Sequence, residues 1–273
     1  MGHRGNGVTW QAPGRVNLIG EHTDYNAGYV LPFAIEQACA ATVERLDECT
    51  LVIRSAQRAD QAHLSYDRLQ PGAAVGWAAY AAGVVWAMRQ RGADLPGMRF
   101  AVDSTVPPGA GLSSSAALTC AVATAVDDFL ALRLSPAELL SVTRSAENDF
   151  VGAPTGGMDQ LAALNCTADN ALFCDMRTLE IEQVPLPLAA SGLTILVIDT
   201  HASTPAEPSR VRSRGAGRGS PPTVRSRPGP GPCWPPRHGC AGSGHQSGNP
   251  SGRTPRRAVR GSGAACTPRF RCA

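Results

Sequence analysis

The sequence predicts an α+β fold for residues 1–203, and three observations support this prediction. Short apolar runs that are bounded by turn or polar residues are typical of strands. Longer segments repeat apolar residues at the spacing of an α-helix. The two kinds of segment do not alternate in the regular order of a doubly wound parallel sheet. A mixed fold is therefore favoured over a doubly wound one.

Six segments are expected to be strands: Val8–Trp10, Ala38–Arg45, Thr50–Ser55, Met98–Ser104, Ala171–Asp175 and Thr194–Asp199. Three are expected to be helices: Gly76–Gln90, Ser113–Leu130 and Pro136–Phe150. The first helix has one apolar face, typical of core packing rather than of a cofactor site, made of Trp77, Tyr80, Ala81, Val84 and Met88. The third begins with Ser135, Pro136 and Glu138 in the order of a capping box.

Charge divides the chain at about residue 203. Residues 1–203 hold 12 arginines and 21 acidic residues, a net charge of −9, whereas residues 204–273 hold 13 arginines and one acid, a net charge of +12. The second segment also contains 12 prolines and 12 glycines, a proportion typical of disordered chains. We therefore expect a folded lobe over residues 1–203 and a tail without secondary structure over residues 204–273.

The composition of the tail allows three interpretations. The chain contains no lysine, which indicates GC-rich coding DNA, and out-of-frame reading of such DNA yields Arg, Pro, Gly, Ser and Cys; a frameshifted tail is favoured. A nucleic-acid-binding arm is disfavoured, because Trp234 and Phe270 alone are too few aromatic residues for base stacking. A metal site is disfavoured further, because no CxxC spacing joins Cys233, Cys240, Cys266 and Cys272.

Targeting and membrane signals were also considered. The first 35 residues lack the apolar core of a signal peptide, and no run of 18 apolar residues predicts a membrane span. Residues 1–203 carry five cysteines in apolar runs, as buried free thiols do in a reducing compartment. We expect a cytoplasmic protein without a membrane partner, and the sequence indicates no oligomeric state.

The segment VPPGAGLSSSAAL, residues 106–118, is the first candidate for ligand binding. Small residues let the backbone approach a ligand, and the following helix start offers N–H groups and a positive dipole end to a phosphate. The candidate residues are Pro108, Gly109, Ala110, Gly111, Leu112, Ser113, Ser114 and Ser115. Alternatively, the serines only cap the helix. A P-loop is excluded because it needs lysine, and a dinucleotide fingerprint because Ser114 replaces its third glycine.

The segment GRVNLIGEHTDYNAG, residues 14–28, concentrates hydrogen-bonding side chains. Glu21, His22 and Asp24 suit a polyhydroxyl ligand, since carboxylates accept from vicinal hydroxyls and imidazole donates or accepts. The alternative is a solvated surface loop. A metal site at these three residues is disfavoured, because no further histidine lies close by in sequence.

The segment AENDFVGAPTGGMDQ, residues 146–160, is the third candidate. A helix carrying Glu147 is expected to end near Gly152, and Gly156 and Gly157 turn the chain so that it presents Asp159. Such a carboxylate could accept a proton from a sugar hydroxyl, and Glu147 could hold Mg²⁺. Taken alone, this segment is better interpreted as a helix cap.

Together, GRVNLIGEHTDYNAG, PPGAGLSSSAAL and GAPTGGMDQ resemble, in order and spacing, the signature, ATP loop and catalytic segment of the galactokinases, a branch of the GHMP family of small-molecule kinases. The resemblance covers roughly Gly7 to Asp199. It implies the N-terminal lobe of that fold, which is similar to the second domain of ribosomal protein S5. It also implies galactose and ATP as partners and Mg²⁺ as cofactor.

The resemblance implies a role for each candidate residue. Glu21, His22 and Asp24 would hold galactose hydroxyls. Asp159 would be the general base at the C1 hydroxyl and Arg15 its electrostatic partner. The loop Pro108–Ser115 would wrap ATP, with Ser115 and Glu147 at Mg²⁺.

The sequence departs from the family after VIDTHAS. There the family continues with a tyrosine-containing part of the sugar pocket and a third glycine-rich motif, neither of which follows Ser203. We therefore expect most of the second lobe to be missing, and a site built between two lobes excludes water poorly with one absent. Two functions stay open: a galactokinase by descent, and a non-catalytic remnant that binds a sugar or, through its tail, a nucleic acid.

Overall fold

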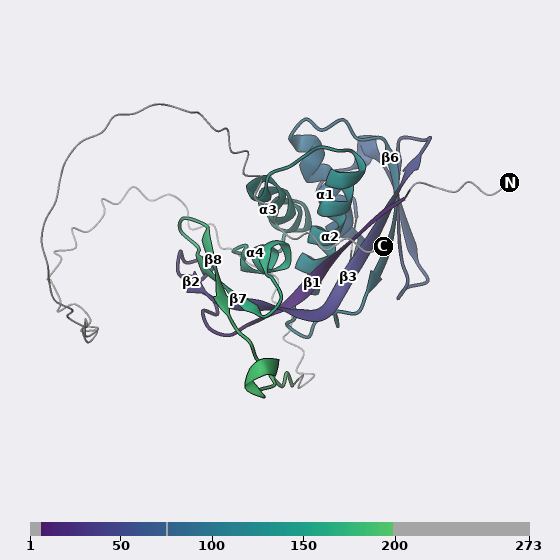
Figure 1. Cartoon of the computed structure of the whole chain (residues 1–273). Helices are drawn as coiled ribbons and strands as arrows, with labels where there is room; N and C mark the ends of the chain where they lie inside the picture. Colours follow the sequence, from purple (N-terminus) through teal and green to yellow (C-terminus); the bar gives the residue numbers. More distant parts are fainter. Residues whose placement is uncertain (1–6, 75, 199–273) are drawn as a thin grey trace, which may run out of the picture. The chain divides into compact units, whose positions relative to one another are not determined.

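The computed structural model describes residues 7–74 and 76–198, and in that range it contains a five-stranded sheet, a three-stranded sheet and four α-helices (Figure 1). The strands of the larger sheet are ordered β1-β3-β6-β4-β5. Their bounds are β1 Val8–Asn17, β3 Pro32–Leu46, β4 Thr50–Ser55, β5 Gln61–Ser65 and β6 Gly97–Ser104. This mixed architecture confirms the α+β prediction.

The larger sheet is antiparallel except at one pair of strands. β3 pairs with β1 on one side and β6 on the other, β4 pairs with β5, and β4 runs parallel to β6. The register of β1 against β3 shifts between Pro13 and Arg15. Such an irregularity re-aims the following side chain, and here that side chain is Arg15.

The four helices are α1 (Ala78–Gln90), α2 (Ser114–Phe129), α3 (Pro136–Ser145) and α4 (Met158–Asn165), and Figure 1 shows them on one side of the long strands β1 and β3. Helix α2 is buried on nearly all sides from Ala116 to Asp127, as expected of a helix that is apolar all round. The main core forms between this helix, α1 and the sheet. The start of α2 is therefore held on a rigid base.

A smaller sheet is built from β2 (Tyr29–Val30), β7 (Asn170–Asp175) and β8 (Glu180–Pro185), with β7 in the centre. Its buried face packs against α3 and α4 in a second apolar cluster that includes Val30, Leu140, Met158, Leu161 and Leu172. The cluster holds α4, and so the segment before it, against the rest of the lobe.

Several expected elements differ from those observed. The predicted helix Pro136–Phe150 ends as an α-helix at Ser145 and continues as a π-helix, Ala146–Val151, up to Gly152 in the left-handed conformation (φ 80°). The capping box at Ser135 and Glu138 is confirmed. Helix α4 and strands β2, β5 and β8 were missed, because each is short and carries little periodic pattern.

The predicted strand Thr194–Asp199 was wrong over its described part. Residues 193–198 form no strand, and Leu193, Leu196 and Ile198 are more than 60 % exposed. An apolar run becomes a strand only when a neighbouring strand pairs with it, and within residues 7–198 none does. The tail assigned to residues 204–273 lies outside the described residues. No helix of the described part is long and apolar enough to cross a membrane.

Candidate active site

Arg15 lies in β1 directly after the irregularity at Gly14. Its backbone N–H donates to the carbonyl of Leu112 at 3.2 Å, and its Nη1 donates to the carbonyl of Gly111 at 2.8 Å. Gly14 is required for this approach, because a Cβ at that position would lie 2.7 Å from the Leu112 carbonyl oxygen. Strand β1 is thus fastened to the glycine-serine loop through Arg15.

Asp159 is presented by the first turn of α4. Gly157 precedes the helix with φ of 107°, a conformation that favours glycine. A carboxylate in the first turn also interacts favourably with the helix dipole. The chain is therefore turned so that Asp159 points toward β1.

Arg15 and Asp159 form a close ion pair. Arg15 Nε donates to Asp159 Oδ1 at 2.8 Å, and Nη2 lies 2.6 Å from the same oxygen. The side chains are 13 % and 22 % exposed, respectively, so the pair is screened less than a surface pair. One guanidinium therefore joins Asp159 to the loop residue Gly111.

The start of α2 carries no side-chain cap. Ser113 adopts the left-handed conformation (φ 60°, ψ 43°) and makes no capping hydrogen bond, while Ser114 and Ser115 belong to the helix itself. The interpretation of the serines as caps was therefore wrong for Ser113. Its Oγ is buried and has no hydrogen-bond partner among residues 7–74 and 76–198. Uncapped N–H groups and a buried hydroxyl without a partner are features of an anion site.

Glu147 is a buried carboxyl group in the π-helix. It is 1 % exposed, and Thr119 Oγ1, also buried, donates to its Oε1 at 3.4 Å. Burial, followed by the nearby charge of Asp159, raises the pKa of Glu147 from 4.5 to about 7. The Ser115 hydroxyl and the Gln160 amide lie close enough to oppose this shift, although neither amide atom of Gln160 makes a hydrogen bond with good geometry.

The segment 21–27 forms a turn at the surface. Asp24 is half-buried and packs on Gly156, where a Cβ would lie 2.6 Å from the Asp24 carbonyl carbon. Glu21 and His22 are exposed, and the ring nitrogen Nδ1 of His22 is hydrogen-bonded to the Tyr25 hydroxyl at 2.5 Å. The structure thus brings Asp24 to the segment that presents Asp159, while no described contact joins Glu21 or His22 to it.

Sequence reasoning missed two buried residues of this region. Thr119 and Gln160 lie one turn into α2 and in the first turn of α4, respectively, and both are fully buried beside Glu147. A polar residue in an otherwise apolar helix is the signal that could have identified Thr119. The described part of the chain contains no group of three or more His, Cys, Asp or Glu side chains that could hold a metal ion.

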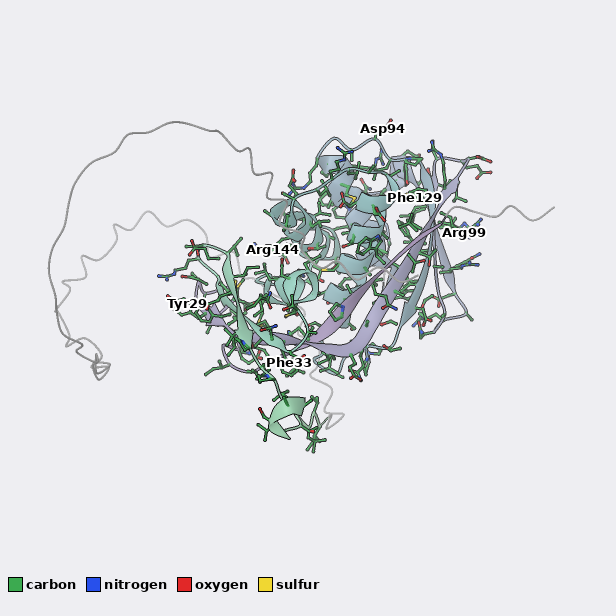
Figure 2. All side chains as sticks on the ribbon, viewed as in Figure 1. Tyr29, Phe33, Asp94, Arg99, Phe129 and Arg144 are labelled. Carbon is green, nitrogen blue, oxygen red and sulfur yellow. The ribbon has the colours of Figure 1, made fainter. Side chains whose placement is uncertain are left out.

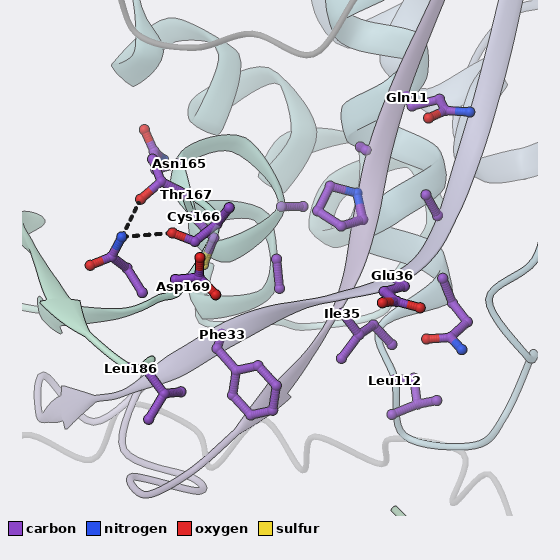
Figure 3. Close-up of a pocket in the computed structure, with 18 of the residues that line it drawn as sticks. Gln11, Phe33, Ile35, Glu36, Leu112, Asn165, Cys166, Thr167, Asp169 and Leu186 are labelled. Carbon is purple, nitrogen blue, oxygen red and sulfur yellow. Dashed lines mark hydrogen bonds between the residues drawn. The ribbon is translucent and has the colours of Figure 1, made fainter. Parts of the chain in front are cut away.

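A large cavity lies beside this constellation rather than around it. It has a volume of about 1060 Å³ and lies between β1, β3 and the segments around residues 163–170 and 186–197 (Figure 3). Its described lining includes Ala110 and Leu112 of the glycine-serine loop, but not Arg15, Glu147 or Asp159. The ion pair therefore borders the loop on a different side.

Two parts of the chain match models of known protein families. Residues 79–166 match the GHMP kinases N terminal domain, and residues 1–45 match the galactokinase galactose-binding signature. A galactokinase of Streptomyces coelicolor is 50 % identical over 193 residues, which cover 70 % of this chain and 50 % of that protein. The chain belongs to the galactokinase branch of the GHMP kinases.

Other GHMP kinases share the fold. A galactokinase of Mycobacterium tuberculosis is 42 % identical over 195 residues, 71 % of this chain and 53 % of that protein. The structure of Lactococcus lactis galactokinase complexed with galactose superposes with a TM-score of 0.64 and 30 % identity, covering 67 % of this chain and 48 % of that one. Methanococcus jannaschii mevalonate kinase, at 16 % identity and a TM-score of 0.55, shares the fold alone. The chain spans about half the length of the galactokinases it matches.

Proposed function

We propose that this site transfers the γ-phosphoryl group of ATP to the C1 hydroxyl of galactose. The observation that supports the proposal most is the double contact of Arg15. Its guanidinium holds the Asp159 carboxylate and the Gly111 carbonyl together. A group that can accept a hydroxyl proton is thereby fixed at the edge of a loop suited to a phosphate.

The proposed reaction uses each group in one role. The oxygen of the C1 hydroxyl attacks the γ-phosphorus of ATP and ADP leaves, while Asp159 accepts the proton of that hydroxyl. Arg15 keeps the carboxylate in place and stabilises the negative charge that develops on the oxygen. Positioning and charge stabilisation are the main contributions a protein makes to phosphoryl transfer.

ATP is proposed to bind along residues 108–115. The uncapped amides at the start of α2 and the unpartnered hydroxyl of Ser113 supply donors to its phosphate oxygens. Ser115 and Glu147 are the residues that would hold Mg²⁺, because the Ser115 hydroxyl lies close to the buried Glu147 carboxyl group. Bound Mg²⁺ would neutralise phosphate charge, and it commonly takes one or two carboxylates together with substrate phosphates.

Galactose is proposed to lie between the turn 21–27 and Asp159. The contact of Asp24 with Gly156 supports this. Gly156 lies two positions before Met158, the first residue of α4, so the contact brings one predicted sugar ligand close to the helix turn that carries Asp159. Glu21 and His22, which lie exposed on the same turn, would contact other hydroxyls of the sugar. A cytoplasmic location is also proposed, supported by the free thiols of Cys39 and Cys120, whose pKa values burial raises.

The experiment measures galactose binding by calorimetry and galactose-dependent ADP formation separately, on the full chain. We expect galactose to bind more tightly than glucose and ADP to form only with galactose. Asp159→Asn should abolish ADP formation and leave galactose binding within a few-fold. The control is Asp94→Asn, an exposed residue four positions after the last residue of α1, labelled at the top of Figure 2.

The outcomes separate two functions. Galactose binding without ADP formation would refute the kinase proposal for this chain and support a sugar-binding remnant. Absence of both would refute both functions. ADP formation that survives in Asp159→Asn would refute the assignment of the general base.

A further inference from the structure

A second cavity lies on the other side of α3. It has a volume of about 480 Å³ and is lined by residues from the end of α1, from α3 and the π-helix, and by Leu179 between β7 and β8. The volume is within the range of about 300–1,000 Å³ that small-molecule pockets occupy. Its described lining contains none of the residues assigned above to sugar, ATP or Mg²⁺.

Two arginines supply the charge of this cavity. Arg91 follows the last residue of α1, and Arg144 lies in the last turn of α3 (Figure 2). Among the described residues, neither guanidinium lies within ion-pair distance of a carboxylate. Asp149, the acidic residue of the lining, accepts a hydrogen bond from Ser145 at 2.6 Å. The lining therefore has a net charge of +1, and its carboxylate already has a donor.

Arg144 is the most informative of these residues. Its Nε is buried and has no hydrogen-bond partner in the described structure. A buried donor without an acceptor destabilises a fold by about 1–3 kcal/mol, and by more when it is charged. Nε itself is too buried for a ligand to reach, but Arg144 lines the cavity and its guanidinium makes no hydrogen bond or ion pair in the described structure, so a ligand in the cavity can supply the acceptor for its other nitrogens.

The side chain of Arg144 is held in place by its surroundings. Its Cδ lies against the turn before α4, since a Cβ on Gly157 would come within 2.8 Å of that atom. Arg91 Nη2 is fixed in turn by donating to Ser141 Oγ, which leaves the Ser141 hydroxyl proton free to donate into the cavity. Donors that are already immobilised lose little conformational entropy when a ligand binds.

We propose that this cavity binds a phosphate group, either as the free ion or as part of a small phosphorylated metabolite. Two guanidinium groups and one hydroxyl line it, Arg144 and Ser141 from α3 and Arg91 from the end of α1. A tetrahedral phosphate presents several oxygens in different planes, whereas a carboxylate presents two oxygens in one plane. The side chains of Leu140, Ala137 and Leu179 add an apolar wall on which a small carbon skeleton can lie.

The test measures binding of inorganic phosphate and of glycerol 3-phosphate to the full chain by calorimetry at constant ionic strength. Arg144→Gln and Arg91→Gln should each weaken binding at least tenfold, and Arg54→Gln, at an exposed position of β4, should not change it. Phosphate held at the glycine-serine loop would be unaffected by the first two substitutions. Tighter binding of glycerol 3-phosphate than of phosphate assigns a metabolite, and equal binding assigns the free ion.

A second measurement uses the unaltered chain, so that a folding defect in a variant cannot decide the result. Phenylglyoxal modifies exposed arginines, and mass spectrometry measures its rate at Arg91 and at Arg54, both of which are exposed. Phosphate should slow modification at Arg91 at least fivefold and leave Arg54 unchanged. Equal rates at Arg91 with and without phosphate, or equal affinities in all three variants, would overturn the proposal.

Discussion

Arg15 and Asp159 lie 144 positions apart in the sequence, and two nitrogens of Arg15 contact one and the same oxygen of Asp159, at 2.8 Å and 2.6 Å. The remaining terminal nitrogen of Arg15 donates to Gly111. One planar guanidinium thus links the Asp159 carboxylate to the Gly111 carbonyl. A lysine has a single charged nitrogen and cannot reproduce this fork.

Arg15→Lys tests this coupling without requiring activity. We expect the lysine to keep the ion pair with Asp159 and to lose the bond to Gly111, so that the loop opens more often. Amide hydrogen exchange over residues 109–113 should become at least tenfold faster. The control is Arg99→Lys, which alters a more exposed pair with Glu44 at 3.3 Å. Unchanged exchange in Arg15→Lys would show that the backbone bond to Leu112 is sufficient to hold the loop.

Glu147 makes the stability of the chain depend on pH. Its pKa is raised from 4.5 to about 7 in the fold, so the folded state keeps a proton that the unfolded state has lost between these values. Folding is therefore favoured less as pH rises from about 4.5 to about 7. The full loss, about 3 kcal/mol as an upper estimate, applies above pH 7.

Glu147→Gln should remove this dependence. The amide resembles the protonated carboxyl in shape and cannot ionise, so the variant should match the original chain near pH 4 and be more stable by up to about 3 kcal/mol at pH 8. Urea unfolding at several pH values, without Mg²⁺, measures the difference. Glu48→Gln, at an exposed position, is the matched control. If both variants follow the same pH profile, the burial of Glu147 does not control stability.

Gly156 sets the distance between the turn 21–27 and the segment of Asp159. Gly156→Ala would place a methyl group 2.6 Å from the Asp24 carbonyl carbon, so one of the two segments must shift. We expect galactose affinity to fall at least tenfold. Calorimetry checks this, and Gly7→Ala, whose added carbon would meet the flexible side chains of Glu44 and Thr42 at 3.3 Å, is the control. Equal affinity in the two variants would contradict the placement of Asp24 in the sugar site.

The sequence predicted those features that local chemistry determines. The strand Thr50–Ser55 and the capping box at Ser135 were located correctly, because apolar runs and capping residues act within a few positions. The paired prediction of Arg15 and Asp159 rested on family resemblance. The spacing of residues in the sequence could not show that two nitrogens of Arg15, in β1, contact one oxygen of Asp159, in α4.

The remaining features depend on tertiary contacts. Ser113 was expected as a possible cap, but its left-handed backbone turns the side chain into a buried position without a partner. The run from residue 194 was expected as a strand, and no described strand pairs with it. The burial of Glu147 depends on how α2 and α4 pack around the π-helix, which no local pattern encodes.

The composition of residues 204–273 leads to a prediction about the coding DNA. This segment has a net charge of +12, against −9 for residues 1–203, and contains a single acid, a contrast that a change of reading frame in GC-rich DNA would produce. We expect another frame after codon 203 to encode a tyrosine-containing segment and, later, a glycine-rich loop. Resequencing and translation in three frames check this.

If another frame encodes both, joining it to residues 1–203 should give a chain with galactose-dependent ADP formation. If no frame does, the arginine-rich tail is genuine, and binding to DNA that weakens with salt becomes the property to measure.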